Sequence, residues 1–137
     1  MSLLTSAVSM TQAMVQIDST DPGTYEKAMA DWIEQQLSDL SNVLITREDV
    51  LPGRPNLMAE IPGPKHLPAL VMICHMDTVV IGDGWTLPPF EAIEKDGKIY
   101  GRGACDMKSG LACCLSAFIM AARTLHASGQ TPKRTLK

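Results

Sequence analysis

Apolar residues recur at helical spacing in three stretches of the chain. The first extends from about Leu3 to Ile17, and the third extends from Met107 to about Ala127, before Gly129, a natural C-cap. The second follows Thr24, whose hydroxyl makes it a candidate N-cap. One apolar face of this second helix would consist of Met29, Trp32, Ile33, Leu37 and Leu40.

Strand signals fill the interval between the second and third helices. Short runs from Val43 to Glu48 and from Leu57 to Ile61 predict two strands. The run from Ala69 to Cys74 is continuously apolar, which is typical of a strand buried on both faces of a parallel sheet. Further on, Asp96-Gly97 separates two short segments, and this dipeptide is the strongest short-range signal for a tight hairpin.

The order of these elements predicts an α/β fold with a helix-flanked mixed sheet. The tail from Pro132 to Lys137 is typical of the approach to a further strand. With 137 residues, the chain is at most one domain. Ligands of such sheets collect at the carboxyl ends of strands, so the residues just after Cys74 are the first candidates for chemistry.

Composition excludes several function classes. With 45% hydrophobic residues, 20% charged residues and a net charge of -3, the chain has no basic surface for nucleic acid. The longest near-apolar run, Leu111 to Ala122, is shorter than a membrane span, and the amino terminus lacks a signal-peptide pattern. We therefore expect a cytoplasmic protein that binds neither nucleic acid nor membrane. Its cysteines lack metal-binding spacing and are expected to be reduced thiols: Cys74, Cys105, Cys113 and Cys114.

His75 directly follows the apolar run, and Asp77 comes two residues later. On an extended strand these two side chains lie on the same side. A histidine that binds a metal ion usually donates its other N–H to a carboxylate, and Asp77 is placed for that role. The alternative is a polar pair that only satisfies itself at the end of a strand.

Asp106 lies where glycines lead from the hairpin into the long helix. Gly101 and Gly103 begin a pattern like the Gly-x-Gly-x-x-Gly of dinucleotide sites, but Asp106 replaces the last glycine. A carboxylate there would repel a pyrophosphate, so a cation fits this position better than a nucleotide. The alternatives are a helix N-cap and a nucleotide-binding domain, and a cofactor titration would decide the latter.

Together these segments resemble a known family, the di-zinc amidohydrolases and peptidases that include acetylornithine deacetylase, succinyl-diaminopimelate desuccinylase, aminoacylase and glutamate carboxypeptidase. The similarity is carried by His75-Met76-Asp77-Thr78-Val79, Gly82-Asp83-Gly84-Trp85 and Tyr100-Gly101-Arg102-Gly103-Ala104-Cys105-Asp106-Met107-Lys108. It extends over nearly the whole chain and includes the segment from Pro52 to Leu57. Cys74 and Ser109 stand where glycine is common in the family.

The resemblance implies roles for three residues. His75 would bind one metal ion, Asp106 would bridge two, and Asp77 would be the catalytic aspartate that holds His75. The metal would be zinc, two ions in a complete site, with cobalt or manganese as alternatives. The resemblance also implies a cis peptide bond between Asp106 and Met107.

It further implies that residues 1–137 form the amino-terminal portion of a catalytic domain, without the lid or dimerisation domain. The general-base glutamate and a neighbouring metal-binding glutamate would also lie outside these residues. The full-length parent would hydrolyse an amide or peptide bond in N-acyl amino acids or small peptides, and a homodimer is a further expectation. Residues 1–137 alone are expected to be inactive and, with an unpaired sheet edge, prone to self-association. The alternative is a non-catalytic metal-binding or regulatory module of the same fold.

Overall fold

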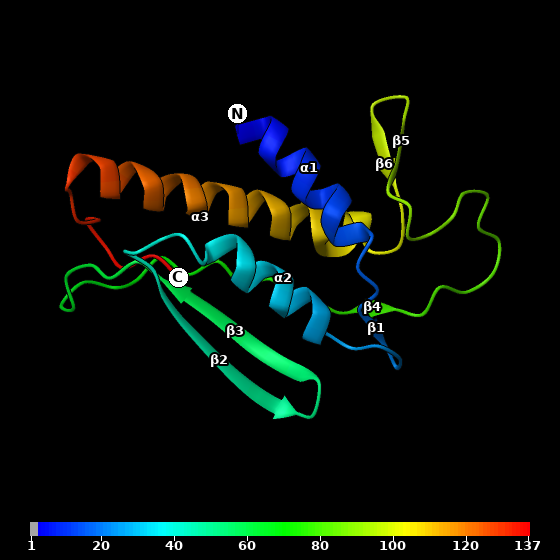
Figure 1. The fold of residues 1–137 in the computed structure, drawn as a ribbon, viewed down its shortest axis with the longest axis horizontal. Coiled ribbons are helices and arrows are strands. Elements are labelled where there is room, and N and C mark those ends of the chain that lie inside the picture. Colours follow the sequence, from blue (N-terminus) through cyan, green and yellow to red (C-terminus); the bar gives the residue numbers. More distant parts are fainter. Residues whose placement is uncertain (1–2) are drawn as a thin grey trace.

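The computed structural model describes residues 3–137 and the side chains from residue 7 onward. Its long helices are α1 (Leu3–Val15), α2 (Lys27–Leu37) and α3 (Ser109–Ser128), as the apolar spacing predicted. A short helical turn, η1 (Ala104–Lys108), leads directly into α3. α1 packs on α3, whereas α2 packs on β3, so that α2 lies between α3 and the β2–β3 pair (Figure 1).

The strands form three pairs within the described residues. β1 (Thr20–Asp21) and β4 (Thr78–Val79) are parallel. β2 (Leu44–Leu51) and β3 (Arg54–Glu60) are antiparallel, as are β5 (Ile93–Lys95) and β6 (Lys98–Tyr100). Both strand directions therefore occur beside the helices, which confirms the predicted α/β class with mixed pairing.

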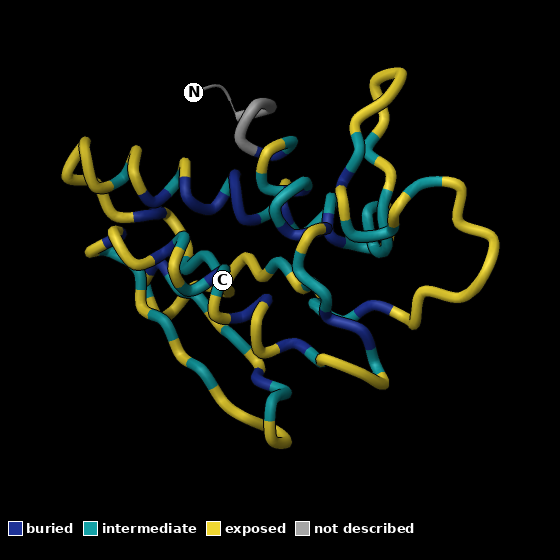
Figure 2. The backbone as a smooth tube through the Cα atoms, turned by 45° about the vertical axis from the view of Figure 1, so that its right-hand side comes forward, coloured by how far each residue is buried: buried dark blue, intermediate teal, exposed yellow. Residues whose placement is uncertain are grey.

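The hairpin between β5 and β6 confirms the prediction from Asp96-Gly97. Both residues have positive φ, 52° for Asp96 and 70° for Gly97. A two-residue turn with both φ values positive matches the twist of the flanking strands. Figure 2 shows that the tip of this hairpin and the long loop between β4 and β5 are mostly exposed.

The predicted N-cap of α2 was wrong. The cap position is Glu26, and the Thr24 hydroxyl instead donates a hydrogen bond to the carbonyl oxygen of Asp18 at 3.0 Å. Tyr25 has a positive φ of 58°, so the backbone turns between Thr24 and the helix. Glu26 makes no capping bond because its carboxylate accepts hydrogen bonds from Arg54, one of them from Nε at 3.0 Å.

The apolar run from Ala69 to Cys74 also departs from expectation. It is extended, but it is not a strand buried on both faces: Val71 is 52% exposed and Ile73 is 87% exposed. Met72 and Met76, on the alternate face, pack against the hydrophobic core. The reason is that the described residues cover only one face of this segment, and a continuous apolar run needs a cover on each face.

The tail between Arg134 and Lys137 does pair as a strand. Leu136 forms an antiparallel bridge with Ile61 and a parallel bridge with Leu70. Its N–H donates to the Ile61 carbonyl at 3.1 Å, and the Ile61 N–H donates back at 2.9 Å. Leu136 therefore joins the end of β3 to the beginning of the apolar segment.

The core lies between the helices and this sheet. Its residues include Met14, Met29, Ile33, Leu37, Ile61, Ala112, Leu115, Phe118, Ile119 and Ala122. By length and composition alone, the helical stretch Ala104–Ser128 would be long and apolar enough to cross a membrane, although the run Leu111 to Ala122 is not. In this fold its inner face packs into the core, as does the central helix of a globular domain.

Candidate metal site

The candidate site lies where the extended segment 69–77 meets the turn η1. His75 comes from the end of that segment, and Asp106 comes from η1, just before α3. Together with Asp77 and Thr78 they line a pocket of about 320 Å³. The expectation that chemistry gathers at the carboxyl end of the apolar segment fits this arrangement.

The backbone around Asp106 is irregular. Gly103 has a positive φ of 75°, and a side chain on it would collide with the methyl group of Thr78. Asp106 has φ -124° and ψ 98°, which are extended values inside a helical turn. The peptide bond between Asp106 and Met107 is cis, as the resemblance implied. This turn directs the Asp106 carboxylate toward His75 instead of along the helix.

His75 and Asp106 approach each other closely. The distance between His75 Nε2 and Asp106 Oδ1 is 3.0 Å. The Asp106 side chain is 89% exposed and that of His75 is 43% exposed, so both remain accessible from solvent. Two residues that lie far apart in the sequence thus present a nitrogen and an oxygen to the same point.

Asp77 contacts the other ring nitrogen of His75. His75 Nδ1 lies 3.1 Å from the backbone carbonyl oxygen of Asp77 and 3.4 Å from its carboxylate Oδ1. A carbonyl oxygen only accepts, so Nδ1 carries the hydrogen and donates it. The expected contact with Asp77 is therefore present, but its shorter part is made by the backbone of Asp77.

This tautomer has a consequence for Nε2. If Nδ1 holds the hydrogen of a neutral imidazole, Nε2 presents a lone pair to the carboxylate of Asp106. Two acceptors 3.0 Å apart attract each other only when a proton or a metal cation lies between them. An imidazole nitrogen and a carboxylate oxygen are both ordinary zinc ligands, so the pair fits a bound metal ion.

In the absence of metal, a proton can occupy this position between His75 and Asp106. The hydrogen bond to Asp106 raises the pKa of His75, and the backbone bond and charge of Asp77 act in the same direction, whereas partial desolvation opposes them. A protonated His75 cannot bind metal through Nε2. Proton and metal therefore compete for the same position.

Other candidate ligands stay apart from this pair. His66 lies in the loop between β3 and the extended segment, and His126 lies in the last turn of α3, whereas Asp106 precedes the first turn. Among residues 3–137, no group of three or more His, Cys, Asp or Glu side chains is placed to hold a metal ion. The four cysteines are free thiols, as expected.

The sequence reasoning missed Lys108. Its side chain is 1% exposed, and its Nζ donates a hydrogen bond to the carbonyl oxygen of Ile17 at 2.7 Å. Burial lowers the pKa of Lys108 to about 8, and the charge of Asp18 opposes this shift. Lys108 ties the turn that carries Asp106 to the loop between α1 and β1. The only signal in the sequence was a lysine at the beginning of an apolar helix.

Comparison with known proteins identifies the family. A sequence model of Peptidase family M20/M25/M40 matches residues 71–137, the stretch that contains His75, Asp77 and Asp106. A Staphylococcus epidermidis protein named probable succinyl-diaminopimelate desuccinylase is 39% identical over 99 residues, which are 69% of this chain and 23% of that protein. The chain belongs to the M20/M25/M40 peptidase family.

A second curated relative of this M20 chain is the succinyl-diaminopimelate desuccinylase of Gluconacetobacter diazotrophicus. It is 47% identical over 78 residues, which are 56% of the chain and 19% of that protein. The M20 chain therefore spans about a fifth of the length of these curated relatives.

Solved structures agree at the level of the fold. Human carnosine dipeptidase 1 superposes with a TM-score of 0.71 at 23% identity, over 95% of this chain and 30% of that one. The di-peptidase Dug1p of Saccharomyces cerevisiae gives a TM-score of 0.71 at 19% identity, over 98% of this chain and 31% of its own. The helix-flanked arrangement of the M20 chain thus occurs within larger proteins.

Proposed function

We propose that this M20 chain contributes to the metal-dependent hydrolysis of an amide or peptide bond in N-acyl amino acids or small peptides. The observation that supports this proposal most strongly is the approach of His75 Nε2 to Asp106 Oδ1 at 3.0 Å. Relatives named desuccinylase and dipeptidase, which act on such bonds by name, support the substrate class.

In this proposal His75 and Asp106 hold the metal, with Asp106 shared between two zinc ions, and cobalt or manganese would be substitutes. Bound zinc would supply a Lewis acid that polarises the scissile carbonyl and lowers the pKa of water. The residues of this chain supply the geometry. Asp77 fixes the tautomer of His75, so that the lone pair of Nε2 faces the metal.

The turn around Asp106 supplies orientation. Its carboxylate is 89% exposed, which leaves its second oxygen open to another cation. Lys108 fixes the position of the turn through its hydrogen bond to the Ile17 carbonyl oxygen. Because hydrogen-bonded groups of fixed geometry lose little freedom when they bind a ligand, these contacts would raise the affinity of the pair for metal.

Location and assembly are part of the same proposal. Four free thiols agree with a reducing, cytoplasmic environment. The substrate would be a small molecule, and the net charge of -3 does not favour nucleic acid as a partner. A homodimer is a further part of this proposal.

Titration with Zn²⁺ or Co²⁺ tests the metal assignment. We expect weak binding that His75→Ala and Asp106→Ala each weaken by about tenfold or more, and that Asp77→Ala weakens less. His126→Ala is the matched control, because His126 lies in the last turn of α3 and should leave affinity unchanged. Equal affinity in wild type and His75→Ala would refute the assignment.

The pH dependence gives an independent check. The pKa of His75 is raised by Asp106, so His75 becomes protonated at a higher pH than a free imidazole. Metal affinity should therefore fall as pH decreases through that raised pKa, by about tenfold per pH unit below it. Calorimetry at several pH values measures this slope, and an affinity that rises on acidification would contradict the model of competing proton and metal.

A further inference from the structure

The two halves of the candidate metal site come from separate parts of the chain. His75 belongs to the extended segment 69–77, which continues into β4, whereas Asp106 belongs to η1. The direct hydrogen bond between these two parts of the backbone is weak: the His75 N–H lies 3.5 Å from the sulfur of Met107, and a thioether is a poor acceptor. The approach of His75 to Asp106 therefore depends on other contacts that hold both backbones.

Residues 17–20, the link between α1 and β1, contact both halves of the site. In Figure 1 this link leads from α1 to β1, which lies beside β4. Ser19 is completely buried in it, and Thr20 is 8% exposed. Ile17 and Ser19 are only two residues apart, so groups that bind to each of them are held close together.

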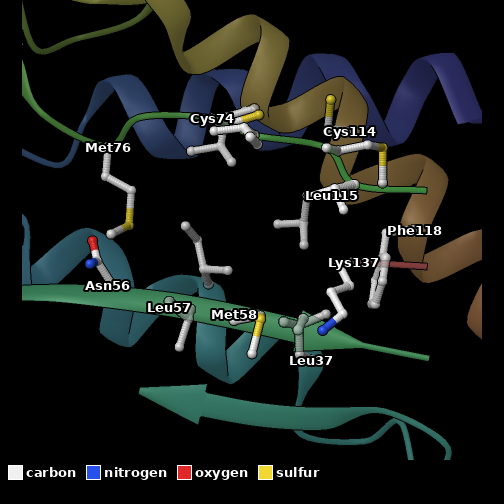
Figure 3. A pocket seen from close by; sticks show the side chains of 16 residues that line it. Leu37, Asn56, Leu57, Met58, Cys74, Met76, Cys114, Leu115, Phe118 and Lys137 are labelled. Carbon is white, nitrogen blue, oxygen red and sulfur yellow. The ribbon is translucent and has the colours of Figure 1, made fainter. Parts of the chain in front are cut away.

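Ser19 binds the segment that carries His75 at two points. Its hydroxyl donates a hydrogen bond to the carbonyl oxygen of Met76 at 2.7 Å, and its own carbonyl oxygen accepts one from the Thr78 N–H at 3.0 Å. Figure 3 shows the Met76 side chain directed toward Asn56 of β3, and this side chain packs against the core. The backbone that follows His75 is thus fixed by Ser19, and its side chain at Met76 is fixed on the side of β3.

Ile17 binds the half of the site that carries Asp106. Its carbonyl oxygen accepts a hydrogen bond of 2.7 Å from Nζ of Lys108, which lies two residues after Asp106 at the end of η1. Lys108 is 1% exposed, and the negative charge of Asp18 attracts its ammonium group. A buried ammonium group without such partners is strongly unfavourable, so this contact constrains the position of η1.

The 17–20 link is itself held by internal hydrogen bonds. The carboxylate of Asp18 accepts a hydrogen bond from the Thr20 N–H at 3.0 Å, and its backbone carbonyl oxygen accepts one from the Thr24 hydroxyl at 3.0 Å. Thr20 is also the partner of Thr78 in the parallel pairing of β1 with β4. A link with this many bonds resists a movement of one half of the site relative to the other.

We propose that Ser19 and Lys108 are positioning residues, which hold His75 and Asp106 at a fixed separation through the 17–20 link. This inference rests on the function proposed above, in which His75 and Asp106 bind metal. Neither Ser19 nor Lys108 is a metal ligand in it, and each acts on the backbone that carries one. Because ligands that are already in place lose little freedom on binding, the link raises metal affinity without contact to the metal.

The first test needs no metal. Nuclear Overhauser effects between the ring protons of His75 and the β protons of Asp106 report whether the two side chains are held together in the apo chain. We expect these signals in the wild type and a reduction of them in Ser19→Ala and in Lys108→Met. If Lys108→Met does not fold, Ser19→Ala decides alone, since it removes only one hydroxyl group.

The second test is titration with Zn²⁺. We expect Ser19→Ala and Lys108→Met each to weaken binding by about tenfold. The matched control is Ser116→Ala, the same substitution at a serine that is 4% exposed, donates a hydrogen bond to the Met10 sulfur at 3.2 Å and does not line the pocket of the metal pair. The control should retain both the affinity and the Overhauser signals. All variants are measured where circular dichroism shows them folded, so that a general loss of stability does not change the affinity.

The outcomes separate this inference from the proposed function. Overhauser signals that are equal in wild type, Ser19→Ala and Lys108→Met, or absent from the wild type, would overturn the positioning role whatever the chain does with metal. An equal loss of affinity in Ser116→Ala would also overturn it, because any buried serine would then matter as much. Reduced signals in the variants of a chain that does not bind Zn²⁺ would support the positioning role and refute the metal assignment.

Discussion

Gly103 has no side chain, which allows the turn that carries Asp106 to lie close to Thr78. Its φ of 75° and its contact with the Thr78 methyl leave no room for a Cβ, and the turn that carries Asp106 begins there. A side chain at Gly103 would push η1 away from β4, and Asp106 away from His75. The conformation of one glycine therefore bears on the 3.0 Å distance in the candidate site.

We predict that Gly103→Ala destabilises the chain by about 3 kcal/mol, because it combines backbone strain with a steric collision. Gly82→Ala is the matched control: Gly82 also has a positive φ, 69°, but a Cβ there would meet no atom within 4 Å. The control should lose only about 1 kcal/mol, from backbone strain alone. Urea unfolding of both variants measures the difference, and equal losses would show that the contact with Thr78 is unimportant.

For single residues, the sequence indicated which side chains are candidates for the site better than it indicated the distances between them. His75 and Asp106 could be singled out because a polar residue after an apolar run and a carboxylate after two glycines are both unusual. Their contact could not be predicted from spacing, because it depends on the irregular backbone at Asp106. Burial of Lys108 was likewise hidden, since its partner is a backbone carbonyl, that of Ile17, which leaves no mark in the sequence.

Among the elements, local signals predicted best. The β5–β6 hairpin depends only on Asp96 and Gly97, and the helices depend on spacing within each segment. The extended segment 71–76 was predicted less well, because the burial of a strand depends on its neighbours. Its two faces differ, with Ile73 exposed and Met72 packed on the core.

The contact between this segment and α3 predicts a difference among the thiols. Burial, assisted by the nearby Cys114, raises the pKa of Cys74 to about 11, from 9.0. At pH 8 this reduces the thiolate fraction of Cys74 by roughly 100-fold relative to an unperturbed thiol. Iodoacetamide should therefore modify Cys105 and Cys113, which are exposed, well before Cys74. Peptide mass spectrometry after timed quenching gives the order, and early labelling of Cys74 would mean that the segment detaches from α3.

For the whole molecule, the membership in the M20/M25/M40 family followed from motifs spread along the chain, and the fold comparisons agree with it. The two donors of the candidate site lie within residues 3–137, and the chain spans about a fifth of its curated relatives. Catalysis needs groups that accept and deliver a proton as well as groups that bind metal. The metal-binding pair alone is therefore not a complete catalytic site.

We predict that residues 1–137 alone do not hydrolyse N-acetyl amino acids, N-succinyl amino acids or dipeptides, with or without added Zn²⁺. The reason is that His75 and Asp106 form only a pair of donors, and among residues 3–137 no group of three or more His, Cys, Asp or Glu side chains is placed to hold a metal ion. Release of free amine, followed with ninhydrin, measures this. Zinc-dependent turnover that His75→Ala abolishes would prove the prediction wrong.

The double pairing of Leu136 also affects how the chain folds during synthesis. Ile61 and Leu70 are held together through a residue that is far from both in sequence. Contacts between distant residues form late, because a long loop must close before they contribute any stability. While the ribosome is still adding residues 71–135, β3 and the apolar segment have no common partner. This part of the sheet, next to the metal pair, therefore closes only after α3 has been synthesised.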